Sequence, residues 1–273
     1  MKNLVFFLLL IISLTSCGEY NKVLNKGDIK TQYKMAEELY KEGRYNRAMA
    51  LFEKVAPTFI NKPQLQRIRY MSAKSDYALK NYTIAAYRFN RFINNYPKSS
   101  KIEEVYYLAA QSHYKISPLS SLDQKDTDKA LTSLQDFLDK YPDSEHTEEI
   151  NNQYKELTQK LEKKAFDIAY LYYKTEKYKS AIVAFDNFIS EYLGTKYKED
   201  ALFYKFKSAY KLGIKSVVYK KEKRLKAAIK AHKRFVKYYP ESDYRKESDN
   251  LLKKAIKELE TTESLNIKQY DGL

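Results

Sequence analysis

A small residue followed four positions later by a larger one recurs five times along the chain, and this spacing strongly constrains the fold. The five pairs are Ala48 and Phe52, Ala85 and Phe89, Ala130 and Leu134, Ala181 and Phe185, and Ala228 and His232. Residues four apart lie on the same face of an α-helix. The alanines let a second helix approach closely, and the larger side chain fills the gap toward the next unit. The pattern therefore predicts helices that pack in pairs.

Tyr-Pro pairs mark the ends of several predicted helices, at Tyr96-Pro97, Tyr141-Pro142 and Tyr239-Pro240. Proline disfavours helical geometry in the residue before it, so each helix is expected to stop there. These spacings resemble the tetratricopeptide repeat, a helix–turn–helix unit of about 34 residues whose copies stack into a solenoid. Only six Gly and six Pro occur, which disfavours a turn-rich β protein. We therefore expect an all-α fold, a tetratricopeptide-repeat α-solenoid of about five helix pairs with a C-terminal capping helix.

The repeat period is irregular, because the interval between the alanines of successive pairs varies from 37 to 51 residues. We place one insertion at 117–124, as a loop between the paired helices of the third unit. A second insertion lengthens a helix over about 144–175, which contains no Pro or Gly. A third lies near 213–221, and a final helix over about 242–261 is expected to cap the stack.

The N-terminus has the pattern of an export signal. Lys2 precedes an unbroken apolar run of nine residues from Leu4 to Ile12, which is too short for a membrane span of about 20 residues. The run leads to Leu14-Thr15-Ser16-Cys17, which resembles the lipobox of bacterial lipoproteins. This resemblance implies that Cys17 is acylated and that the preceding peptide is removed. Cys17 is the only cysteine, so an internal disulfide is excluded.

These patterns predict five segments. Residues 1–16 are the lipoprotein signal peptide and residues 17–27 a polar tether. Residues 28–142 hold the N-terminal repeats, units 1 to 3. Residues 143–262 hold the C-terminal repeats, units 4 and 5, with the cap. Residues 263–273 are expected to form a loose tail.

Positive charge is concentrated near the C-terminal end. The chain has 50 basic and 35 acidic side chains, a formal net charge of +15. A basic excess of this size is typical of proteins that bind nucleic acid, anionic lipid or acidic proteins, and the export signal argues against nucleic acid. Ten basic side chains lie between Lys215 and Lys237, against one acidic side chain. The candidate partner-binding residues in this stretch are Lys220, Lys221, Lys223, Arg224, Lys226 and Lys230. A solvated helix face, an acidic partner surface and anionic lipid headgroups all remain open at this point.

Motifs for chemistry do not appear in the sequence. No HExxH motif, cysteine pair, Gly-rich phosphate loop or G-x-S-x-G motif occurs. The three histidines, His113, His146 and His232, belong to different units. We therefore predict no catalytic residue, metal or cofactor, and a protein that is not an enzyme. The 27 tyrosines are expected to lie in the core and the helix seams, or to line a groove for extended peptide.

The combination of lipobox, tether and five divergent repeats resembles the BamD family, the outer-membrane β-barrel assembly lipoproteins. The segment containing Ser117-Pro118, Leu122-Asp123-Gln124, Thr127 and Ala130 is similar to the version found in Bacteroidetes-type bacteria. The resemblance implies a lipid-anchored, periplasm-facing protein of the outer membrane. It implies that C-terminal repeats, here about 165–262, bind the periplasmic domains of the machine's central barrel subunit. The N-terminal repeats, 28–142, would receive unfolded outer-membrane protein substrates.

Other functions remain possible on the sequence alone. One is a tetratricopeptide-repeat lipoprotein that serves a cell-wall or secretion complex. A cell-wall hydrolase is disfavoured, because repeats fill the chain and leave no room for a catalytic domain. A glycan-uptake lipoprotein is disfavoured because the chain contains no Trp for sugar stacking.

Overall fold

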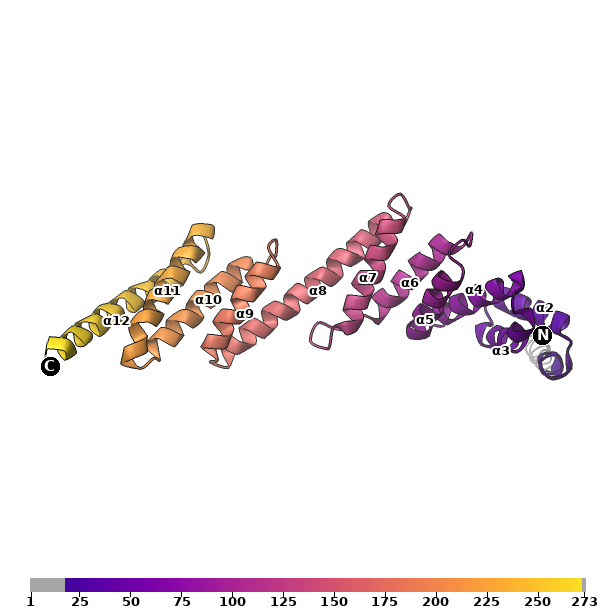
Figure 1. Ribbon diagram of the computed structural model, residues 1–273, viewed down its shortest axis with the longest axis horizontal. Coiled ribbons are helices and arrows are strands. Elements are labelled where there is room, and N and C mark those ends of the chain that lie inside the picture. Colours follow the sequence, from indigo (N-terminus) through magenta and orange to yellow (C-terminus); the bar gives the residue numbers. More distant parts are fainter. Residues whose placement is uncertain (1–17, 272–273) are drawn as a thin grey trace, which may run out of the picture. The chain divides into compact units, whose positions relative to one another are not determined.

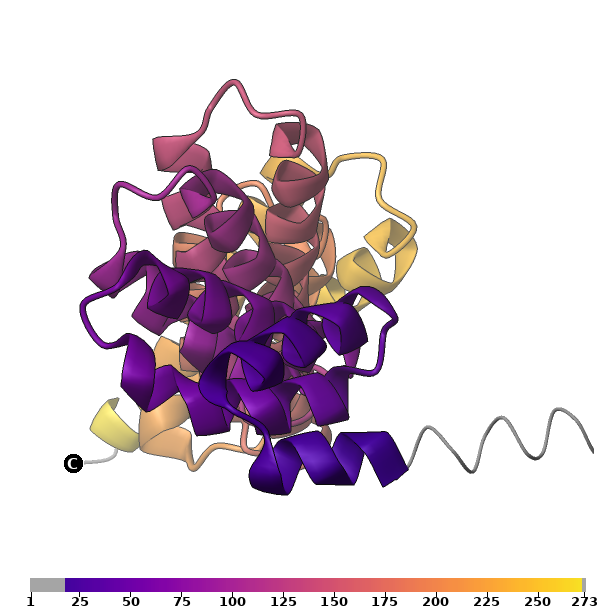
Figure 2. The ribbon, with the colours of Figure 1, turned by 90° about the vertical axis from the view of Figure 1, so that its right-hand side faces the viewer.

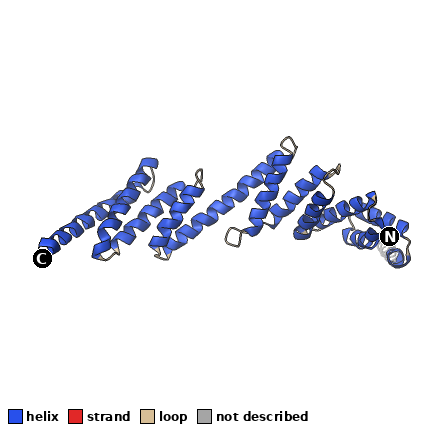
Figure 3. Cartoon of the chain, viewed as in Figure 1, coloured by secondary structure: helices blue, strands red, loops and turns tan. Residues whose placement is uncertain are grey.

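The computed structural model describes the backbone of residues 18–271 and the side chains of residues 18–264. Every regular element in these ranges is a helix (Figure 3). After a helical segment at 18–26, the elements in Figure 1 are α2 (Ile29–Lys41), α3 (Tyr45–Val55), the 3₁₀ turn η1 (Ala56–Phe59), α4 (Pro63–Ala78), α5 (Tyr82–Asn95), α6 (Ile102–Ile116), α7 (Lys125–Lys140), α8 (Thr147–Lys174), α9 (Tyr178–Glu191), α10 (Lys198–Ile214), α11 (Val218–Tyr238) and α12 (Arg245–Asp271).

The helices form two compact units. Among the described residues, one contains 18–118 and 123–154, and the other contains 119–122 and 155–271. The first unit holds the pairs α2–α3, α4–α5 and α6–α7. In the second, α9 packs on the C-terminal part of α8, α10 on α11, and α12 on both α10 and α11. The predicted fold class is confirmed: five helix pairs of tetratricopeptide type are followed by the capping helix α12.

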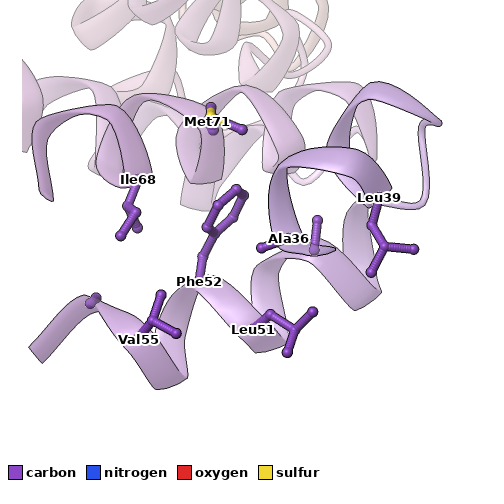
Figure 4. Close-up of a cluster of buried hydrophobic side chains, with 9 residues drawn as sticks. Ala36, Leu39, Leu51, Phe52, Val55, Ile68 and Met71 are labelled. Atoms are coloured by element: carbon purple, nitrogen blue, oxygen red, sulfur yellow. The ribbon is translucent and has the colours of Figure 1, made fainter. Parts of the chain in front are cut away.

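The Ala-and-large-residue pairs form the cores of the helix pairs. All five alanines are fully buried, as are the Phe or Leu residues four positions later in the first four pairs. Figure 4 shows the first of these cores, where Phe52 of α3 lies between Ala36 of α2 and Ile68 and Met71 of α4. Burying one such aromatic ring contributes about 1.5–3 kcal/mol. The helix faces predicted from the Ala-and-large-residue spacing are therefore the faces that form the main apolar contacts.

The tight turns inside the helix pairs need one residue in the left-handed conformation. Gly43, Lys80 and Glu176 have φ angles of +75°, +62° and +59°, and each lies two residues before the tyrosine that begins the next helix. In each turn two backbone N–H groups bond back to the preceding helix, as Gly43 N does to Tyr40 O at 3.1 Å. This is the Schellman arrangement, which satisfies the last carbonyl groups of a helix.

Helix ends largely follow the sequence expectations. The helices α5, α7 and α11 each stop one residue before the tyrosine of a Tyr-Pro pair. Asp28 caps α2, and its side chain accepts a hydrogen bond from Thr31 N at 2.9 Å. These hydrogen bonds lower the pKa of Asp28. The insertion at 117–124 is the loop between α6 and α7, and the predicted long helix is α8.

Two segments differ from the predictions. Residues 18–26, within the predicted polar tether, form a helix that leads into α2 (Figure 2). Its Tyr20 and Leu24 pack against the core of the first helix pair, and the Gln32 amide donates to Val23 O and Leu24 O, both at 3.1 Å. At the other end, α12 continues past the predicted end near Thr261, because no Gly or Pro interrupts residues 245–271.

Candidate protein-binding interface

The predicted partner-binding residues lie on α11, in the second unit. Four of the six are exposed, namely Lys220, Lys223, Lys226 and Lys230, whereas Lys221 and Arg224 are half-buried. The difference follows from helix geometry, since Leu225, Ala228 and His232 turn the opposite face of α11 into the core.

Three of the six residues already have partners inside the unit. Lys221 forms an ion pair with Glu258 of α12. Lys226 bridges Glu222 at 2.7 Å and Glu263 at 3.0 Å. Arg224 donates to the hydroxyl of Ser216 at 2.7 Å. These side chains attach α11 to α12 and to the turn before it, so part of the positive charge is neutralised within the fold.

The other lysines form a continuous exposed line on α11. Lys220, Lys223 and Lys230 make no ion pair with a described carboxylate, and the same holds for Lys233 and Lys237 farther along. We call these five residues the α11 basic stripe. Their spacings of three, four and seven place them on one side of the helix. Such a line of uncompensated charge can attract an acidic protein surface.

An apolar patch adjoins the start of this stripe. Val217, Val218 and Tyr219 expose 55%, 49% and 78% of their surfaces at the turn that leads into α11. Contiguous exposed apolar side chains rimmed by charge are typical of protein-binding sites. Sequence reasoning missed this patch, although the run Val217-Val218-Tyr219 between two helices was a readable signal.

A pocket in the first unit is lined mainly by aromatic and polar side chains. It has a volume of about 500 Å³ between α2, α4 and the turn before α6, with Tyr40, Tyr70 and Phe92 in its wall. Burial and a hydrogen bond to Glu104 raise the pKa of Tyr70 to about 12. Lys74 joins the same group, at 2.7 Å from Glu104. The tyrosines here are thus protonated and held in place.

The second unit has its own tyrosine-lined pocket, of about 350 Å³, between α8 and α10. Tyr170 and Tyr173 of α8 contact Tyr204 of α10, with ring centroids 4.7 and 5.2 Å apart. The Lys207 ammonium lies 5.8 Å from the Tyr204 centroid and 2.6 Å from Glu247 of α12. The tyrosines of these pockets are seam residues, as one of the two alternatives expected, and a groove for extended peptide remains a prediction.

The structure keeps the three histidines apart. His113 contacts Asn90 at 3.3 Å, His146 stacks on Tyr107 at 3.8 Å, and His232 contacts Asp249 at 3.0 Å. Within residues 18–264, no His, Cys, Asp and Glu side chains gather in a metal-binding group. None of the helices in the described part of the chain is both long and apolar enough to cross a bilayer. Cys17 lies outside the described residues, so its lipidation remains a prediction.

Comparisons with known proteins identify the family of the repeat region. The family model YfiO, described as an outer membrane lipoprotein, matches residues 25–225 and 160–272. The chain belongs to this family. The resemblance to the BamD family is confirmed by relatives that carry that name.

Two curated relatives show how far the similarity reaches. A putative outer membrane protein assembly factor BamD from Aquifex aeolicus is 30% identical over 125 residues, which cover 45% of this chain and 41% of the relative. The outer membrane protein assembly factor BamD from Caulobacter vibrioides is 24% identical over 181 residues, or 66% of this chain and 59% of the relative. The chain thus matches less than two thirds of the length of these relatives.

Among solved structures, a TPR repeats protein from Bacteroides fragilis aligns with a TM-score of 0.36 and 13% identity. The alignment covers 84% of this chain and 97% of that protein.

Proposed function

We propose that this outer membrane lipoprotein is a non-catalytic scaffold of the outer-membrane β-barrel assembly machine. It is anchored through acyl chains on Cys17, faces the periplasm, and binds the periplasmic domains of the central barrel subunit through its C-terminal repeats. The relatives named as outer membrane protein assembly factors support a role in outer membrane protein assembly. The α11 basic stripe supports docking of the central subunit on the C-terminal repeats.

The location of the stripe on its helix carries the argument. Lys220 and Lys223 lie in the first two turns of α11, where the helix macrodipole is positive. A cation at that end destabilises a helix by a few tenths of a kcal/mol, up to about 1 kcal/mol. The lysines there therefore lower stability, and the internal ion pairs of α11 do not neutralise them. An acidic partner surface would offset this repulsion on docking.

The apolar patch at Val217–Tyr219 would provide the buried contact area that a row of charges does not provide. Exposed rim charges mainly raise the rate of association, whereas buried apolar and aromatic side chains hold a complex together. Tyr219, at 78% exposure, is the largest apolar side chain at this turn. We propose that it inserts into the central subunit while the α11 basic stripe steers the approach.

The first unit is the proposed receiver of unfolded outer-membrane protein substrates. Its pocket of about 500 Å³ is large enough for one or two side chains of an extended peptide. The half-buried rings of Tyr40 and Tyr70 would stack on an aromatic side chain there.

Co-purification from detergent-solubilised outer membrane tests the proposal. The variant Lys220→Glu, Lys223→Glu, Lys230→Glu reverses three charges of the α11 basic stripe. If each reversal costs about 0.5–1 kcal/mol at a rim position, the total of roughly 1.5–3 kcal/mol weakens binding about 10- to 150-fold. The matched control reverses three exposed lysines of α12, Lys246, Lys253 and Lys257, and should leave recovery unchanged.

The outcomes separate the parts of the proposal. If the wild-type chain recovers only wall-synthesis proteins and no large barrel protein with tandem periplasmic domains, the assigned function is wrong. If the barrel protein is recovered equally by both triple variants, the function stands and the α11 basic stripe is not the docking site. Loss of radiolabelled palmitate in Cys17→Ser is the expected result for the anchor.

A further inference from the structure

Arginine is scarce in this protein, and its distribution is uneven. Nine of the 50 basic residues are arginine and the rest are lysine. Three of the nine, Arg69, Arg88 and Arg91, line one hollow on α4 and α5 of the first unit. Lysine suffices for a solvated surface, whereas arginine is preferred where a carboxylate is held by two parallel hydrogen bonds. Arginine is also enriched and lysine depleted at protein interfaces.

The hollow has an apolar base and an arginine rim. It measures about 240 Å³ and lies between Arg69 of α4 and a line of α5 residues that includes Ile84, Tyr87, Arg88 and Arg91. Ile84 and Tyr87 expose 48% and 60% of their surfaces. The Arg91 guanidinium lies over the Tyr87 ring, 5.7 Å from its centroid. We call these five residues the arginine hollow.

One of the three arginines is fixed by the fold. Arg88 Nε lies 2.8 Å from the buried Asp76, and its terminal nitrogen lies 3.1 Å from Glu53 of α3. Its charge is compensated by these two carboxylates. Arg88 therefore joins α3, α4 and α5, and its compensated charge is not available to an external ligand.

The other two arginines have no partner outside the hollow among the described residues, since the ring that Arg91 contacts, Tyr87, belongs to the hollow itself. Six arginines outside the hollow have partners in the structure: Arg44 with Glu42, Arg47 with the Tyr20 ring, Arg67 with Glu37, Arg224 with Ser216, Arg234 with Asp186 and Arg245 with Asp249. Arg69 and Arg91 make no ion pair with any described carboxylate, and both are exposed. Two guanidinium groups thus face solvent across an apolar surface.

We propose that the arginine hollow is a second protein-binding site, which takes an acidic and partly apolar segment of another envelope protein. A Glu or Asp side chain of that segment would accept hydrogen bonds from Arg69 and Arg91. A neighbouring Leu or Phe would cover Ile84 and Tyr87. This site is separate from the α11 basic stripe, which belongs to the other unit, and its test does not depend on that docking site.

The size of the hollow favours a peptide over a small molecule. Pockets for small ligands usually enclose about 300–1,000 Å³, and this one is smaller and open. Side chains two apart in an extended segment point to the same side, about 7 Å from each other. A carboxylate and an apolar side chain at that spacing can reach the rim and the base together. Charge complementarity and apolar area therefore both favour an extended peptide segment that carries an acidic and an apolar side chain.

Fluorescence anisotropy with a capped peptide tests this proposal on the full-length chain in detergent. The probe is Gly-Ser-Glu-Glu-Leu-Phe-Ser-Gly, in which each Glu lies two residues before an apolar side chain, and its control carries Gln in place of both Glu residues. We expect saturable binding of the Glu peptide below about 1 mM and at least tenfold weaker binding of the Gln peptide. The double variant Arg69→Glu, Arg91→Glu should weaken binding of the Glu peptide by about tenfold or more.

A matched variant separates a site from a general effect of charge. Lys30→Glu with Lys115→Glu changes the net charge of the first unit equally, at exposed lysines without ion pairs, and should bind the Glu peptide like the wild type. All four positions are exposed, and unchanged circular dichroism melting would confirm that the variants fold. Absence of saturable binding, or equal weakening by both double variants, would overturn the proposal. Displacement of the peptide by glycerol phosphate at a lower concentration than by free peptide would assign the hollow to lipid headgroups instead.

Discussion

Acidification is expected to destabilise the second unit through His232. This residue holds, in the fifth helix pair, the position that Phe or Leu holds in the other four. Only 5% of it is exposed, its Nε2 lies 3.0 Å from Asp249 Oδ1, and its ring meets Phe206 edge-on at 5.1 Å. Burial lowers the pKa of His232 below its ordinary value, although the hydrogen bond to Asp249 opposes this. The imidazole is therefore neutral in the folded protein at pH 7.

The sign of the pH dependence follows from that shift. An unfolded histidine titrates near pH 6.5, and the folded one titrates lower. Between these two values the unfolded state takes up a proton that the folded state does not. Stability contributed by the neutral ring is thus complete above about pH 6.5 and is lost as the pH falls toward the folded pKa. The slope is at most about 1.4 kcal/mol per pH unit for one group, so a fall to pH 5.5 costs up to about 1.4 kcal/mol.

Urea unfolding of the wild type and of His232→Leu at about pH 7.5 and pH 5.5 measures this effect. Leucine is the residue at this position in the third pair. In the variant, Asp249 keeps the Arg245 Nε hydrogen bond of 2.8 Å, so its charge remains compensated. Other titrating groups are common to both proteins, and their contributions cancel in the difference. The wild type should lose more stability than the variant on acidification, by up to about 1.4 kcal/mol, and an equal loss in both would refute the reasoning.

Three further substitutions, one with a matched control, test the packing and the turns. Lys80→Gly should raise the free energy of unfolding by about 0.5–1 kcal/mol, because glycine adopts the left-handed conformation of this turn without a steric cost; calorimetry measures the change in Tm. Phe185→Ala should cost about 3–5 kcal/mol in urea unfolding, whereas Val183→Ala, at a position 54% exposed, should stay within about 0.5 kcal/mol. Thr127→Val should cost about 1–2 kcal/mol by removing the hydrogen bonds of a buried hydroxyl, and amide exchange in the loop 117–124 should become faster.

Much of the fold could be predicted because its main signals are local. The small and large residues four apart fix which face of each helix is buried, and the Tyr-Pro pairs fix where helices stop. These depend on neighbours within one or two turns. The same signal was present at the N-terminus, where Tyr20, Val23 and Leu24 have helical spacing. Their apolar character was outweighed by the polar residues between them, so the segment was expected to be a polar tether.

The interface could be predicted only in part because pairing is a tertiary property. The basic run on α11 is visible in the sequence. Its division into compensated and uncompensated charges depends on Glu258 and Glu263, which α12 brings alongside. The arginine hollow is likewise invisible along the chain, since Arg69 and Arg91 come from different helices and become neighbours only when α4 and α5 pack. In both cases the sequence shows which side chains are charged, but not which side chains lie next to them in the folded protein.

If Cys17 is acylated as proposed, the docked helix at 18–26 restricts how the first repeat can move relative to the membrane. Its nine residues span about 14 Å at a rise of about 1.5 Å per residue, and its contacts with Gln32 and Arg47 hold it to the first repeat. A disordered linker of the same length would let the repeat change its position and orientation relative to the lipid surface. A short rigid helix would instead keep the first helix pair beside the bilayer surface and limit the orientations that this pair can take relative to the membrane plane.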